Sequence, residues 1–224
     1  MKLEVYPDRD ILMLDLADVI ASELRSALDH EDTVTLAVPG GTTPGPIFDA
    51  LSAVHMDWGR VNVVLTDERW VPETSERSNT RLIRERLLTG QAAPARYIPL
   101  YADTPEPEAS MDALSEQVRQ VLPINVLLLG MGADMHTASL FPGADRLEEA
   151  LANDAPALMP MRAPGAPEPR ITLTAPVLKG ALSTHVLITG ADKRNAVEKA
   201  HSLHDPLKAP ISVILGEATV HWAE

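Results

Sequence analysis

A short apolar run that ends in glycines and a histidine constrains the fold of this chain most. Leu127–Leu129 is apolar, and Gly130 and Gly132 follow it closely, ahead of Asp134 and His136. A run this short predicts a buried parallel strand, and glycine lets the backbone turn sharply where the strand ends. Ligands of open α/β sheets bind in the crevice outside the carboxyl ends of the strands. We therefore expect His136 to lie in a ligand-binding crevice, although a single loop histidine is more often an ordinary surface residue.

The rest of the chain alternates strand and helix signals. Apolar runs of strand length cover residues 33–38, 61–65 and 186–188, and residues 13–28, 47–54, 82–87 and 111–121 carry apolar side chains at helical spacing. This alternation predicts an α/β fold, a three-layer sandwich with a doubly wound, mostly parallel sheet of the Rossmann-like type. Residues 211–222 fit a short helix or a strand. The length of 224 residues favours a single domain over residues 1–224.

Proline marks the segment between the central strand and residue 170. Five prolines occur in 14 residues, at Pro156, Pro160, Pro164, Pro167 and Pro169. Because proline lacks a backbone donor and breaks both helices and ladders, we expect a long loop here. Such a loop is suited to cover a site.

Polar turns follow three further strands. Gly40, Gly41, Thr42 and Thr43 follow the strand at 33–38. The helix that begins there offers free N–H groups and hydroxyls, an arrangement that binds phosphate, but no Gly-Lys-Ser/Thr follows to make a Walker A loop. A tight turn with a threonine cap explains these residues about as well.

Charged residues occupy the other two strand ends. Asp67 and Arg69 follow the strand at 61–65, and Lys193 follows Gly190 after the strand at 186–188. Asp67 and Arg69 alone would most simply be a surface charge cluster. The recurrence of polar turns at the carboxyl ends of strands favours a shared site instead.

Composition excludes several classes of partner. A net charge of −13 and a pI near 4.9 disfavour nucleic acid and anionic lipid as partners. There is no cysteine, and no apolar run approaches the roughly 18 residues that a membrane span needs. We expect a soluble, cytoplasmic protein, and the sequence leaves its oligomeric state open.

Two weak motifs do not indicate a cofactor. Gly130-x-Gly132 begins like a dinucleotide fingerprint, but Met135 replaces its third glycine. His201 and His204 have metal-ligand spacing without an acidic third ligand, which favours a solvated helix face. We expect neither a nucleotide nor a metal.

With these motifs in hand, the chain resembles the 6-phosphogluconolactonase family, a branch of the glucosamine-6-phosphate deaminase superfamily. The resemblance spans nearly the whole chain, and its specific part is His-Thr-Ala-Ser-Leu-Phe-Pro. The family usually has Asp-Gly-His where this chain has Asp134-Met135-His136. The motifs that carry the resemblance are Pro39–Pro44, Thr66–Pro72 with Ser78-Asn79, Leu129–Gly143, Arg170–Thr174 and Gly190-x-x-Lys193.

The resemblance implies hydrolysis of 6-phospho-D-glucono-1,5-lactone to 6-phospho-D-gluconate in the oxidative pentose phosphate pathway, with no obligatory cofactor. His136 would be the general base, Asp67 would orient the histidine or the water, and Arg69 would bind phosphate or stabilise the oxyanion. The expected phosphate anchors are Gly40, Gly41, Thr42, Thr43, Arg170 and Lys193. Arg170 is the weakest of these, because it precedes a strand.

Three alternatives stay open. A glucosamine-6-phosphate deaminase or isomerase would share a strand-end Asp and a similar histidine turn. Ser139 lies at helical spacing from His136 and could act as a nucleophile, although the Gly-x-Ser-x-Gly elbow is absent. A non-catalytic sugar-phosphate binding module would need cations and amides but no base, so Asp67 and His136 argue against it.

Met135 carries an expectation about the backbone. Because methionine replaces the family's glycine, we expect a negative φ at residue 135 and a thioether that packs beside the pocket wall.

Overall fold

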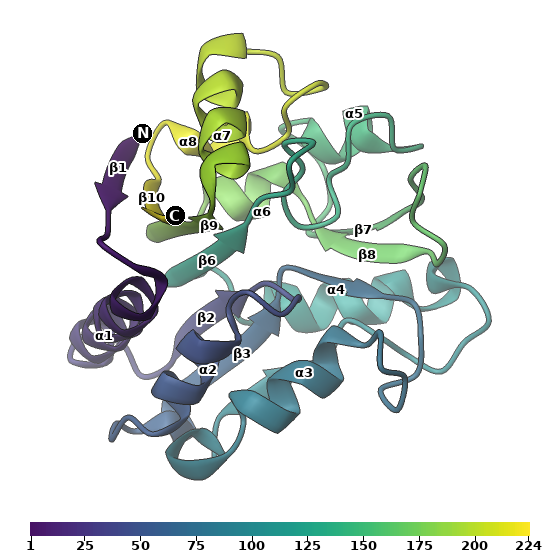
Figure 1. Cartoon of the computed structure of the whole chain (residues 1–224). Helices are drawn as coiled ribbons and strands as arrows, with labels where there is room; N and C mark the ends of the chain where they lie inside the picture. The colour runs from purple at the N-terminus through teal and green to yellow at the C-terminus, as the bar shows by residue number, and fades with distance from the viewer.

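The computed structural model describes residues 1–224 and confirms the predicted α/β architecture (Figure 1). Seven parallel strands form the main sheet in the order β1-β10-β9-β6-β2-β3-β5. All residues of β2 and β3 are buried, as their apolar runs predict for strands covered on both faces. The strands are β1 (Lys2–Val5), β2 (Val34–Val38), β3 (Val61–Leu65), β5 (Arg96–Ile98), β6 (Val126–Gly130), β9 (Ser183–Thr189) and β10 (Thr219–Ala223).

A second, antiparallel sheet of three short strands was not predicted. Its order is β4-β8-β7, formed by β4 (Asp67–Arg69), β8 (Arg170–Leu173) and β7 (Leu158–Met161). The polar turn after β3 is therefore partly a strand, and the expectation of a long loop before residue 170 is wrong at β7. Pro160 is compatible with β7 because this strand lies at the edge of its sheet, where a missing donor is tolerated.

Helices cover both faces of the main sheet. In Figure 1, α1, α2 and α3 lie below the sheet and pack side by side, and α6, α7 and α8 lie above it. Asp8 caps α1 and Ser78 caps α3 through their side-chain oxygens. None of the helices is both long and apolar enough to cross a membrane. The helices are α1 (Arg9–Leu28), α2 (Gly45–Ser52), α3 (Asn79–Arg86), α4 (Met111–Arg119), α5 (Leu147–Leu151), α6 (Ala175–Lys179), α7 (Ala191–Leu203) and α8 (Ser212–Leu215), with 3₁₀ turns η1 (Trp58–Arg60), η2 (Gly90–Ala92) and η3 (Pro107–Ser110).

The end of the chain contains both of the structures that its sequence left open. Residues 212–215 form α8, and residues 219–223 form β10, which inserts between β1 and β9. Because β1 and β10 are neighbouring parallel strands, the N-terminus lies where this pair begins and the C-terminus where it ends (Figure 1).

The strand order creates a crevice at the carboxyl ends of β2 and β6. From β2 the chain moves outward to β3 and β5, and it then returns to β6 on the other side of β2. The loops that leave two neighbouring strands in opposite directions open a crevice at this switch point. The glycine turn after β2 and the His136 turn after β6 both emerge there, next to the antiparallel sheet.

Candidate active site

A cavity of about 230 Å³ lies at this switch point between the two sheets. It brings together all of the predicted site residues except Thr42, which does not line it. The predicted residues along its wall are Gly40, Gly41, Thr43, Asp67, Arg69, His136, Arg170 and Lys193. Residues separated by more than 150 positions in the sequence therefore form one pocket.

His136 is oriented by Asp134. Its Nδ1 lies 2.5 Å from Asp134 Oδ1, and the same oxygen accepts the His136 backbone N–H at 3.2 Å. In a neutral ring, the Nδ1–H group then donates a hydrogen bond to the carboxylate, and Nε2 carries the free lone pair. The expectation that Asp67 orients the histidine is not supported, since Asp134 makes this contact. The Asp-x-His spacing was the signal in the sequence that could have revealed the pair.

Glycine at residue 132 makes room for the imidazole. A Cβ atom on Gly132 would collide with the His136 ring and with the Asp134 carboxylate. Phe141 contacts the ring from another side, with the two centroids 4.3 Å apart. The catalytic candidate is thus held between a bare backbone and an aromatic side chain.

The prediction of negative φ at Met135 is wrong. Its φ is +68°, in the left-handed region that glycine normally occupies. Two backbone hydrogen bonds impose this turn: Met135 N donates to Gly132 O at 2.9 Å, and Ile211 N donates to Met135 O at 3.1 Å. The side chain is half-buried against the hydrophobic core and does not line the cavity. The chain has kept the glycine geometry and tolerates the methionine.

Replacing Met135 by glycine is therefore expected to stabilise the protein. The left-handed conformation costs a non-glycine residue about 1–2 kcal/mol, which glycine avoids, while lost packing and added chain entropy offset part of the gain. Met135→Ala is the matched control because it loses the same packing and keeps the strain. Denaturant unfolding should rank Met135→Gly above wild type and Met135→Ala below it. A Met135→Ala variant that is more stable than Met135→Gly would show that the turn is not strained.

Asp67 is held by hydroxyl groups. Its Oδ2 accepts the Ser139 hydroxyl at 2.6 Å, and its Oδ1 accepts the Thr66 hydroxyl at 3.3 Å. Arg170 Nη1 lies 3.7 Å from Oδ2. Because the Ser139 hydroxyl donates to Asp67 and makes no hydrogen bond with His136, the structure does not support Ser139 as a nucleophile.

Arg69 and Arg170 form a pair of neighbouring cations across the β4–β8 ladder. The Nε atom of each is buried and has no hydrogen-bond partner. Burial lowers the pKa of Arg170, with the charge of Arg69 acting in the same direction and that of Asp67 opposing it. Two adjacent guanidinium groups on the wall of one cavity are suited to bind an anion. Arg170 reaches the cavity although it precedes a strand, since antiparallel pairing places the start of β8 beside the end of β4.

The remaining wall comes from three helix starts. Lys193 lies in the first turn of α7, and Gly40 and Gly41 precede α2. Asn79, at the start of α3, also lines the cavity, and its Nδ2 donates to the Asp67 backbone oxygen at 2.9 Å. A Cβ atom on Gly40 would collide with the Asn79 side chain. Asn79 belongs to the motifs that carry the family resemblance, but it was not among the predicted site residues.

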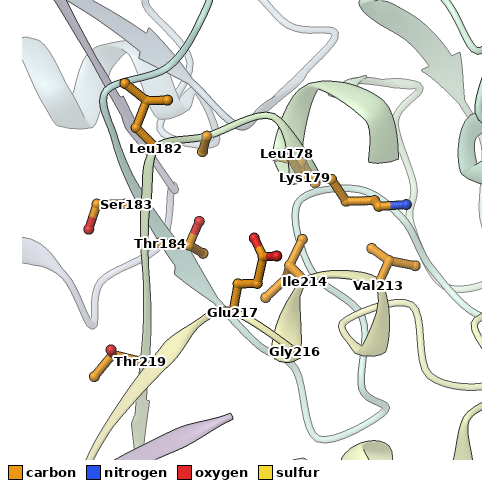
Figure 2. Close-up of a pocket in the computed structure, with 11 residues that line it drawn as sticks. Leu178, Lys179, Leu182, Ser183, Thr184, Val213, Ile214, Gly216, Glu217 and Thr219 are labelled. Atoms are coloured by element: carbon orange, nitrogen blue, oxygen red, sulfur yellow. The ribbon is translucent and has the colours of Figure 1, made fainter.

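Another cavity, of about 350 Å³, lies at the amino ends of the strands of the main sheet, where β9 and β10 begin (Figure 2). Lys179 and Glu217 are its only charged side chains, among hydroxyl and aliphatic groups such as Leu182 and Ile214. It contains no histidine or arginine. Neither cavity includes three or more His, Asp or Glu side chains arranged to hold a metal ion.

Comparisons with known proteins agree on one family. The model of the glucosamine-6-phosphate isomerases/6-phosphogluconolactonase family matches residues 7–222. The 6-phosphogluconolactonase of Rhizobium meliloti is 38% identical, with 99% of this chain and 98% of the relative covered. That of Pseudomonas aeruginosa is 40% identical, with 92% and 88% covered. The crystal structure of a 6-phosphogluconolactonase from Shewanella baltica superimposes with a TM-score of 0.96 at 32% identity, covering 100% of this chain and 98% of the other. A monomeric glucosamine-6-phosphate deaminase shares the fold, with a TM-score of 0.83, at 17% identity, covering 100% of this chain and 98% of the other.

Proposed function

This chain belongs to the glucosamine-6-phosphate isomerase/6-phosphogluconolactonase family, and we propose that it hydrolyses 6-phospho-D-glucono-1,5-lactone to 6-phospho-D-gluconate in the oxidative pentose phosphate pathway. One observation carries the proposal: the oriented His136 shares a cavity with two arginines that are cross-strand neighbours. A lactone that carries a phosphate needs both a base and an anion site. We place this activity in the cytoplasm.

In this mechanism His136 Nε2 takes a proton from a water molecule as the water oxygen attacks the lactone carbonyl. The Asp134 carboxylate stabilises the imidazolium that forms, because it accepts a hydrogen bond from Nδ1. Collapse of the tetrahedral intermediate breaks the bond to the ring oxygen, and that oxygen takes the proton back from His136. Water and lactone together give the open hydroxy acid, so no other reactant is consumed.

The positively charged side chains of the cavity have two separate roles. An arginine donor stabilises the negative charge that develops on the carbonyl oxygen, and Arg69 is our candidate for it. Arg170, Lys193 and the backbone N–H groups after β2 hold the distant phosphate, with Gly40 and Gly41 in the cavity wall. Asp67 orients the water or a hydroxyl group of the sugar.

Removing either proposed phosphate anchor should weaken product binding. Arg170→Gln or Lys193→Gln is expected to cost about 1.5–3 kcal/mol in the binding of 6-phosphogluconate, the scale of a charge-assisted hydrogen bond. Lys179→Gln is the matched control, since Lys179 lines the other cavity. Titration calorimetry measures all three variants. Unchanged affinity in both anchor variants would place the phosphate elsewhere.

The function itself is tested with freshly generated lactone. Purified protein should accelerate its hydrolysis beyond the spontaneous rate, and the same protein should leave glucosamine 6-phosphate unchanged. Conversion of the amino sugar without acceleration of lactone hydrolysis would reverse the choice between lactonase and deaminase. Binding of both sugars without turnover would indicate a binding module.

A further inference from the structure

Ser139 connects the segment that follows β6 of the main sheet to the antiparallel sheet. It is completely buried and lies three residues after His136, in the segment that leaves the main sheet. Its hydroxyl donates to Asp67 Oδ2 at 2.6 Å, and its backbone N–H donates to Thr172 Oγ1 at 3.1 Å. Thr172 is the cross-strand partner of Asp67 in the antiparallel sheet. Both contacts of Ser139 thus end on the same rung of the β4–β8 ladder.

The other contacts of Asp67 are weaker than the one from Ser139. The Thr66 hydroxyl is 3.3 Å from Oδ1, a long distance for an O–H donor, and Arg170 Nη1 is 3.7 Å from Oδ2. Without the Ser139 hydroxyl, the Arg170 charge would be the strongest influence left on the carboxylate and would draw it away from its present orientation.

From this geometry we propose that Ser139 is a positioning residue that fixes the Asp67 carboxylate relative to His136. The proposal rests on the lactone hydrolysis proposed above. Ser139 touches neither the water nor the lactone in this account. Ser139 keeps the general base His136, which follows the main sheet, at a fixed distance from the Asp67 carboxylate of the antiparallel sheet. The reaction geometry requires this fixed distance.

Ser139→Ala is expected to lower kcat about tenfold to a hundredfold, the range for one charge-assisted hydrogen bond, while KM changes less than about threefold. Thr174→Val is the matched control. Thr174 is also completely buried and also donates its hydroxyl, to Pro156 O at 2.6 Å, but it lies outside the cavity. It reports what loss of a buried hydroxyl does through stability alone, and its kcat should stay near that of wild type.

A double-mutant cycle identifies the path through Asp67. In an Asp67→Asn background, Ser139→Ala should change the residual kcat by less than about twofold, because the contact it removes has already been altered. Equal losses in both backgrounds, or equal losses in Ser139→Ala and Thr174→Val, would overturn the positioning role.

A crystal structure of Ser139→Ala separates this proposal from the proposed function, since it needs no substrate. The Asp67 carboxylate should rotate toward Arg170 or occupy two rotamers. An unchanged Asp67 would overturn the proposal even if the wild-type protein is an active lactonase. If the wild-type protein proves inactive on the lactone while Asp67 rotates in the variant, the proposed function fails and the positioning contact stands.

A second and independent observation is a chain of hydrogen bonds far from this cavity, where α1 and the N-terminal strand meet β9 and β10. Glu23 Oε2 lies 2.9 Å from His185 Nε2, and His185 Nδ1 lies 3.0 Å from His221 Nε2. His221 Nδ1 lies 2.9 Å from the Tyr6 hydroxyl, which donates to Asp15 Oδ2 at 2.8 Å. Both histidines are buried.

The number of protons in this chain can be counted. Its four contacts each need one proton. Neutral His185, neutral His221 and Tyr6 supply one each, and the carboxylates at the two ends supply none. One contact would therefore place a nitrogen lone pair against an oxygen lone pair. A fourth proton removes this repulsion.

We infer that the chain binds this additional proton as a His185 imidazolium held between Glu23 and His221. Burial lowers the pKa of His221 to about 4, helped by the charge of His185, which keeps His221 neutral. Burial raises the pKa of Glu23, but the hydrogen bond and charge of His185 lower it more, which keeps Glu23 ionised.

The surrounding charges favour a cation at this position. Glu4 of β1 and Asp15 and Glu23 of α1 line the adjacent pocket, and Lys2 is the only cation among its lining residues. Lys2 is paired with Glu4 at 2.7 Å. The Ser183 hydroxyl, 3.2 Å from His185 Nε2, adds no charge. The proton thus stabilises the packing of β1 and α1 against β9 and β10.

Long-range ¹H–¹⁵N spectra of the imidazoles at pH 7.5 test the inference directly. His185, assigned from the signal lost in His185→Gln, should have both nitrogens protonated, and His221 should have one. A singly protonated His185 would overturn the inference.

Discussion

His136→Ala is expected to lower kcat for 6-phosphogluconolactone by about 10²–10⁴, the usual cost of removing a positioned general base. The ring is 30% exposed and makes its one polar side-chain contact with Asp134, itself largely exposed, so its loss should leave the fold intact. The phosphate anchors are separate side chains, so 6-phosphogluconate should bind the variant with wild-type affinity. Hydrolysis assays with the spontaneous rate subtracted measure kcat, and titration calorimetry measures the affinity for 6-phosphogluconate.

His201→Ala is the matched control for this variant. His201 is an exposed histidine on α7 and does not line the cavity. It should keep full activity. Activity of His136→Ala within a few-fold of wild type would remove His136 from the mechanism, whatever its position in the cavity.

Glu68→Gln is expected to destabilise the protein by about 2–4 kcal/mol. The Glu68 side chain is completely buried beneath the start of α3 and accepts hydrogen bonds from the backbone N–H groups of Arg69, Asn79 and Thr80 and from the hydroxyls of Ser78 and Thr80. Burial raises the pKa of Glu68, and the hydrogen bonds from Asn79 and Thr80 oppose this shift.

The amide that replaces the carboxylate has the same size, but its NH₂ group faces some of these hydrogen-bond donors, which then lose their acceptor. The negative charge at the N-terminus of α3 is lost as well. Glu85→Gln, on α3 itself, is the matched control. Glu85 is exposed and pairs only with Arg81, so its loss should cost at most about 0.5 kcal/mol. Urea unfolding of both variants decides the question. Equal midpoints would show that the buried carboxylate is not what secures α3.

The four central strands of the main sheet, β9, β6, β2 and β3, were predictable because they carry a strong local signal, whereas β1 was not predicted and β10 was left open between helix and strand. Val34–Val38 and Val61–Leu65 are apolar runs bounded by turns, and burial on both faces requires such runs. The antiparallel sheet has no such signal. β4 is Asp-Glu-Arg and β7 contains Pro160, and each is a strand only because β8 pairs with it. Pairing between distant segments determines these two strands, and a single sequence does not display it.

The site was predicted in position more than in its internal contacts. Polar residues at the carboxyl ends of parallel strands had to meet, and the sheet order brings them to one cavity. The Asp134–His136 pair depends on a left-handed turn at Met135, which the methionine argued against. The pairing of Arg69 with Arg170 depends on the antiparallel sheet. Side-chain direction in turns follows from φ and ψ, which residue type constrains only weakly.

The central claim is that one cavity holds both the reacting end and the phosphate end of the sugar. A crystal structure of the protein with 6-phosphogluconate tests it most directly. We expect the product carboxylate beside His136 Nε2 and the phosphate within hydrogen-bond distance of Arg170 or Lys193. A product bound outside this cavity, or one with its phosphate against His136, would contradict the account.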